Sequence, residues 1–122
     1  LILAAPAPSK DFDGTWTTTW RCADMERARG YTYEFRGQIK DGVYHAQYGT
    51  KGQPSSLELD GKIEPGGAAG FKGAVVVGSP IAGMGAARGT VSPVYAMARF
   101  GHASGTGDRI NLRPCSLTFV KQ

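Results

Sequence analysis

The residues of this chain that could do chemistry are few, and the most informative are two cysteines. Cys22 and Cys115 stand near opposite ends of the 122-residue sequence, each in a strand-like run. A disulfide between them would join the first strand to the last and would close a loop of about 90 residues. Such a bridge stabilises a fold and performs no reaction. Two free, buried thiols are the alternative.

The sequence gives little support for a metal site or for a catalytic nucleophile. His45 and His102 are the only histidines, and no further ligand stands at metal spacing from either, whereas a structural zinc ion takes about four Cys or His ligands. The serines lack the context of a nucleophile elbow. A triad assembled from distant residues and a carboxylate pair for glycoside hydrolysis remain alternatives. We therefore predict no catalytic residue, no metal site and no cofactor.

The glycine-rich segment 83–89 has the composition of a phosphate-binding loop but not its pattern. Arg88 stands where the dinucleotide fingerprint has its third glycine, and a strand rather than a helix is expected after Pro93. We interpret residues 79–93 as a loop that forms a lid or rim over the mouth of a barrel.

Composition and charge indicate an exported protein that binds no nucleic acid. The chain has a net charge of +4, and its basic residues are scattered along the sequence rather than clustered. No apolar run reaches the roughly 20 residues of a membrane span. Residues 1–11 are typical of the remnant of a signal peptide, with a disordered or expression-derived leader as the alternative. Residues 12–122 are expected to form one domain in a periplasmic or secreted protein.

The pattern of short β-branched and aromatic runs predicts an all-β fold. Asp41-Gly42 is a hairpin signal, Asp60-Gly61 is either a turn or a kink within one strand, and turns are expected at 65–67 and 104–108. We predict a single antiparallel up-and-down β-barrel of seven to eight strands, with a β-sandwich as the alternative. The expected strands are 15–22, 31–40, 43–50, 56–60 with 62–64, 70–78, 94–103, 109–113 and 115–121.

Alternation along the strands tests the predicted bridge. Cys22 shares a face with Trp16 and Trp20, and Cys115 shares a face with Phe119. Both cysteines therefore point toward the core. Four arginines occupy the alternate positions of their strands, which face away from the core, and they predict a basic outer wall: Arg21, Arg36, Arg99 and Arg113.

Aromatic side chains are the candidate ligand contacts. Most are expected to fill the core, and those near an open end could line a small-molecule pocket. Tyr44, Tyr48 and Tyr95 lie off the cleanest apolar faces, so we expect them to be exposed. The candidate binding residues are Trp16, Trp20, Tyr31, Tyr33, Tyr44, Tyr48 and Tyr95.

The segment Phe12-Asp13-Gly14-Thr15-Trp16, with Gly-x-Trp entering the first strand, resembles the calycin superfamily. That superfamily includes avidin-like proteins, lipocalins and small bacterial protease-inhibitor barrels. The resemblance implies a barrel with a ligand in its mouth. It does not extend to the polar contacts of a biotin site, and a bridge from Cys22 to Cys115 differs from the local disulfide of the inhibitor barrels.

We predict a non-catalytic, exported binding module that takes a small molecule or a glycan at one open end of the barrel. The alternative is a protein-interaction or protease-inhibitor domain that acts through its outer surface or loops. The sequence leaves the oligomeric state open.

Overall fold

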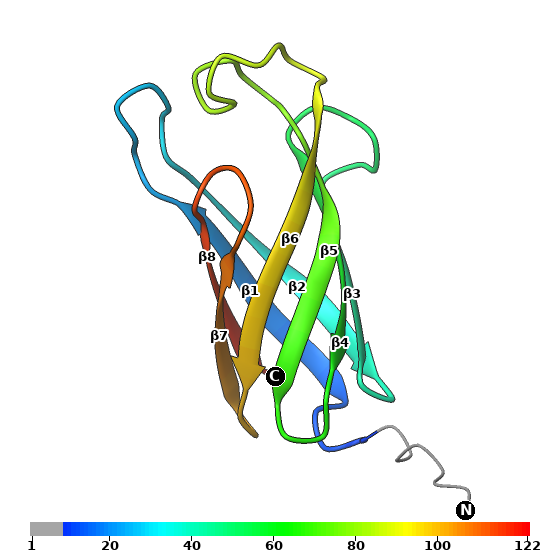
Figure 1. Ribbon diagram of the computed structural model, residues 1–122. Helices are drawn as coiled ribbons and strands as arrows, with labels where there is room; N and C mark the ends of the chain where they lie inside the picture. Colours follow the sequence, from blue (N-terminus) through cyan, green and yellow to red (C-terminus); the bar gives the residue numbers. More distant parts are fainter. Residues whose placement is uncertain (1–8) are drawn as a thin grey trace, which may run out of the picture.

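A computed structural model describes residues 9–122, which form eight antiparallel strands closed into one barrel (Figure 1). Each strand pairs with its neighbours in sequence, and β8 pairs with β1. This confirms the predicted up-and-down barrel and excludes the β-sandwich. Most of the predicted leader, residues 1–8, lies outside the described residues. The strands are β1 Gly14–Cys22, β2 Tyr31–Lys40, β3 Val43–Tyr48, β4 Ser56–Ile63, β5 Ala68–Val76, β6 Val91–Phe100, β7 Ser104–Arg109 and β8 Ser116–Lys121.

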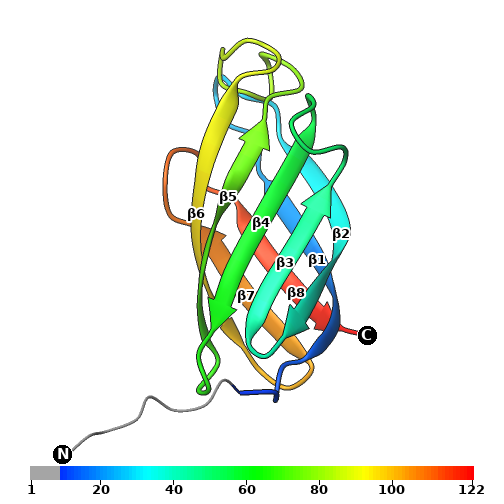
Figure 2. The ribbon, with the colours of Figure 1, turned by 90° about the vertical axis from the view of Figure 1, so that its right-hand side faces the viewer.

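The two ends of the barrel differ in the length of their connections (Figures 1 and 2). Loops 23–30, 49–55, 77–90 and 110–115 gather at one end, which we call the mouth. Short connections at 41–42, 64–67 and 101–103 join the strands at the other end, which we call the closed end. The predicted hairpin at Asp41-Gly42 is confirmed: both residues have positive φ, 52° and 77°, as a tight two-residue turn requires.

The predicted turn at 104–108 is wrong, and of the two alternatives for Asp60-Gly61 the position within one strand is the one that the structure shows. Asp60-Gly61 lies within β4, and residues 104–108 belong to β7. The glycines of β7 serve close packing: a side chain at Gly105 would crowd Phe100, and one at Gly107 would crowd Ala98. Because β7 begins earlier than expected, the predicted strand at 109–113 is wrong. Only Arg109 is in a strand, and residues 110–113 lie in the loop that follows.

Alternating side chains fill the closed half of the barrel. Trp16 is fully buried, its Nε1 donates a hydrogen bond of 2.8 Å to the carbonyl oxygen of Phe12, and its ring lies 5.1 Å from that of Phe100. Phe119 packs between Phe71 and Phe100, with ring centroids 5.6 and 4.5 Å away. This aromatic cluster leaves the closed end solid, so an internal ligand has room only toward the mouth.

The predicted disulfide joins Cys22 to Cys115, and both residues are buried. Cys22 ends β1 and Cys115 directly precedes β8, so the bridge ties the closing pair of strands at the mouth. No cysteine among residues 9–122 is free. The described residues also contain no helix with the length and apolar character of a membrane span.

Candidate functional site

A cavity of about 460 Å³ lies at the mouth of the barrel. The loop 77–90 covers part of it, which is the position expected for the lid or rim segment, and β5, β6 and the loop 110–115 supply further walls. Cavities of this volume are in the range that holds small molecules. The apolar lining includes Val75, Val77, Ala82, Met84, Val91 and Leu112.

Arg109, the last residue of β7, is the first of two arginines in this wall. It is 8% exposed, and its Cζ lies 5.7 Å from the ring centroid of Trp20. Its Nη2 donates to the carbonyl oxygen of Pro93 at 2.7 Å and to Oγ of Ser92 at 3.2 Å, while Nε donates to Oδ1 of Asn111 at 3.2 Å. These bonds fix the guanidinium at the edge of the cavity.

Arg113, the second arginine, joins three segments of the mouth and is only 3% exposed. Its Nη1 donates to the carbonyl oxygen of Ala82 at 2.6 Å, and its Nη2 donates to those of Ala23 and Arg29 at 2.8 and 3.0 Å. Its Cζ lies 5.5 Å from the ring centroid of Tyr31. One side chain in loop 110–115 thus holds loops 23–30 and 77–90 together.

The surroundings of Arg109 disfavour its positive charge. Burial lowers the pKa of the Arg109 guanidinium, and the nearby charge of Arg113 acts in the same direction, while Tyr31 opposes both. A buried cation next to a second cation is costly unless an anion compensates it. The site therefore favours negative charge.

A row of three tyrosines lies beside the cavity. Tyr33 stacks on Tyr48 with ring centroids 4.1 Å apart, and Tyr31 lies 4.8 Å from Tyr33. Burial raises the pKa of Tyr33, the neighbouring Tyr31 and Tyr48 raise it further, and Ser55 opposes them. Tyr31 itself lines the cavity, and its hydroxyl accepts a hydrogen bond of 3.2 Å from Nε1 of Trp20. Burial thus favours the neutral form of the Tyr33 phenol.

The structure brings together some of the aromatic residues predicted as ligand contacts and separates others. Tyr31, Tyr33 and Tyr48 are half-buried at the mouth, and the fully buried Trp20 lies against Arg109 and Tyr31. Three other candidates lie elsewhere. Trp16 and Tyr44 are sealed in the closed half, and Tyr95 is 52% exposed on the outside of the barrel.

Two sequence predictions about side-chain direction are wrong. Tyr44 was expected to be exposed but is fully buried, because its hydroxyl finds a partner in Thr18 at 2.6 Å and its ring fits over Gly37. Arg113 was expected on the basic outer wall with Arg21, Arg36 and Arg99, which are exposed. It points inward because it lies in a loop, where strand alternation does not apply.

Sequence reasoning missed Arg109 and Arg113 as site residues. A signal existed for Arg109: it shares its parity with Gly105 and Gly107, which face inward. Reading residues 104–109 as a strand would have turned this arginine toward the interior. No comparable pattern marks Arg113, because three carbonyl groups distant in sequence hold it in place.

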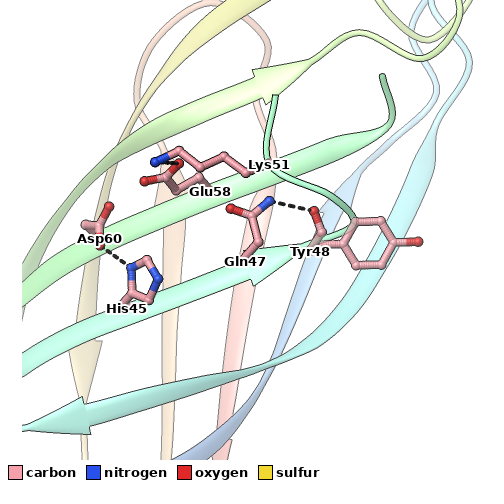
Figure 3. Close-up of polar contacts among 6 residues, drawn as sticks. All are labelled: His45, Gln47, Tyr48, Lys51, Glu58 and Asp60. Atoms are coloured by element: carbon pink, nitrogen blue, oxygen red, sulfur yellow. Dashed lines mark hydrogen bonds and ion pairs between the residues drawn. The ribbon is translucent and has the colours of Figure 1, made fainter. Parts of the chain in front are cut away.

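The histidine with the closest acidic neighbour lies on the outer wall. Nδ1 of His45 on β3 is 2.5 Å from Oδ1 of Asp60 on β4, and Lys51 pairs with Glu58 at 3.4 Å on the same side (Figure 3). The side chain of His45 is mostly exposed and that of Asp60 is partly exposed, and the outer-wall hollow that Asp60 lines includes no serine, threonine or cysteine. Residues 9–122 hold no group of three potential metal ligands.

Comparisons of the chain with family models, with curated proteins and with solved structures give no match.

Proposed function

We propose that this chain is a non-catalytic binding module that holds an apolar small molecule in the mouth cavity. The observation that carries the proposal is the combination of an apolar lining with three convergent polar side chains, those of Tyr31, Arg109 and Arg113. A few placed polar groups in an apolar pocket are typical of small-molecule sites. The resemblance of the Gly14-Thr15-Trp16 segment to calycins supports the same location.

An apolar ligand is a better match than a glycan. Val75, Val77 and Leu112 offer no hydrogen bonds through their side chains, and the hydroxyl groups of a sugar would lose their bonds to water against such a wall. We also propose export from the cytoplasm, supported by the Cys22–Cys115 disulfide, since disulfides persist in oxidising compartments.

Titration with N-phenyl-1-naphthylamine tests this function, because this neutral dye gains fluorescence in apolar surroundings. We expect saturable binding with one site per chain. Ala86→Phe should weaken it about tenfold or more, since Ala86 lines the cavity and a phenyl ring there would occupy it. Ala87→Phe is the matched control, because Ala87 is exposed in the same loop and is not among the lining residues. Absence of saturable binding would refute the proposal.

A second candidate function is protein interaction through the outer wall. A shallow apolar hollow of about 560 Å³ lies between Val43, Tyr95 and Ile110, all of which are more than half exposed. Exposed apolar patches of this kind mark interaction surfaces. Ile110→Gln separates the two functions: a dye signal lost in this variant and kept in Ala86→Phe would favour the outer wall.

A further inference from the structure

The two cavity arginines have no carboxylate partner. Arg109 and Arg113 are both buried, and every acceptor that they meet within residues 9–122 is a neutral carbonyl, hydroxyl or amide oxygen. None of the ion pairs formed by the described residues includes either arginine. The ion pairs within residues 9–122 are Lys10–Asp41, His45–Asp60 and Lys51–Glu58.

The donors of these arginines are incompletely used. Nε of Arg113 is buried and has no acceptor within residues 9–122. Nη1 of Arg109 makes no hydrogen bond to the described residues either, but it is not sealed from solvent. A buried polar group without a partner destabilises the folded chain, and more so when it is charged. The cavity wall therefore contains positive charge that the described residues leave unmatched, and Nη1 of Arg109 is a donor without a partner there.

The two guanidinium groups have different roles. The Nη atoms of Arg113 are held by three loop carbonyls, so this residue positions the rim and supplies charge. Nη1 of Arg109 retains solvent access and can donate to a ligand. Arg109 is fixed by Pro93 and Asn111, so little side-chain entropy is lost when an anion binds.

We propose that the cavity selects amphipathic anions, with a carboxylate or similar group held by Arg109 in the field of Arg113 and an apolar body against Val75, Val77 and Leu112. The inference rests on the proposed function and names its ligand class. A charge-assisted hydrogen bond in a partly dry site is roughly twice as strong as a neutral one. A bound anion would supply the counter-charge that Arg109 and Arg113 do not find within the described residues.

A matched pair of dyes tests the charge. 8-Anilinonaphthalene-1-sulfonate has the skeleton of N-phenyl-1-naphthylamine with one added sulfonate, so their affinity ratio isolates the anion. We expect the sulfonate to bind about tenfold tighter or more. The preference should persist at raised salt, because salt screens buried pairs less than exposed ones. Ala86→Phe should weaken both dyes, which excludes general attraction to a basic surface.

Two arginine variants test whether Arg109 contacts the sulfonate. Arg109→Met should weaken the sulfonate about tenfold and change the neutral dye by less than about threefold. Arg99→Met removes the same charge from the outer wall and should leave both dyes unchanged. Binding of the neutral dye with no preference for the sulfonate would overturn the anion inference and leave the proposed function standing. Binding of neither dye would overturn both. If Arg109→Met does not fold, the ratio in the unaltered chain decides.

Discussion

The ring of Tyr44 lies over Gly37 inside the barrel, in the space that any side chain at residue 37 would need. The two residues are on adjacent strands, β2 and β3, and the Tyr44 hydroxyl reaches across to Thr18 on β1. One aromatic side chain thereby links three strands of the closed half. The missing side chain at residue 37 is a requirement of this packing.

Gly37→Ala should therefore lower the free energy of unfolding by about 1–3 kcal/mol, because a methyl group would displace the Tyr44 ring from a filled core. Guanidinium denaturation measures the change. Gly70→Ala is the matched control, since a methyl group there meets nothing within 4 Å. The control should change stability by no more than about 0.5 kcal/mol. Equal effects in the two variants would contradict the packing argument.

Tyr44 should also make the barrel sensitive to alkaline pH. Burial raises the pKa of Tyr44 well above its usual value of 10.0, and the hydrogen bond with Thr18 opposes this only in part. The folded chain keeps the proton where the unfolded chain loses it. The contribution to stability is complete below pH 10 and declines as pH rises above it.

Urea denaturation between pH 8 and pH 11 measures this decline. Tyr44→Phe should make it shallower, at a cost of about 1 kcal/mol at neutral pH from the lost hydrogen bond. Tyr95→Phe removes a hydroxyl from the outer wall and should keep the slope of the unaltered chain. An unchanged slope in Tyr44→Phe would count against the assignment.

Removal of the disulfide should cost more than either change. Cys22 and Cys115 are 93 residues apart, and in the chain-entropy model a loop of this length contributes about 4–5 kcal/mol. We expect the double variant Cys22→Ala and Cys115→Ala to show a loss of this order in denaturation experiments. Mass measurement without reductant should find no free thiol in the unaltered chain. Detection of two thiols would contradict the bridge.

Arg113→Lys should loosen the mouth while the barrel stays folded. A lysine keeps the charge but lacks the forked donors that reach the carbonyls of Ala82, Ala23 and Arg29. Hydrogen exchange in loops 23–30 and 77–90 should show opening free energies lower by about 1–3 kcal/mol. Arg88→Lys is the control, because Arg88 makes one bond, to Gly78, within one loop. Equal loosening in both variants would argue against a special role for Arg113.

The fold could be predicted from the sequence because two kinds of signal agree. Trp16 and Trp20 alternate with polar residues in β1, and Asp41-Gly42 marks the turn between β2 and β3. The error at Tyr44 has a physical cause: Val43 is apolar but faces outward, so the parity of β3 is obscured. The ring of Tyr44 points inward because Gly37 leaves room for it. That room depends on the pairing of strands, which the local sequence of β3 does not show.

The candidate site was less predictable than the fold. Tyr31 and Tyr33 were proposed from their aromatic character, and both lie at the mouth. The arginines were not proposed, because the glycines of β7 resemble a turn and thus shift the expected strand away from Arg109. For Arg113 the decisive contacts come from loops up to 90 residues away. Local sequence patterns do not reveal contacts between segments so far apart in the chain.

The placement of the chain ends has a practical consequence. Phe12 packs on Phe100 at the closed end, and the backbone nitrogen of Gln122 donates to the carbonyl oxygen of Thr15 at the start of β1. Both ends of the described chain therefore lie away from the mouth (Figure 1). A protein tethered to a sensor chip through a tag at either terminus would present its cavity to the flowing solution. Immobilisation should leave ligand access intact.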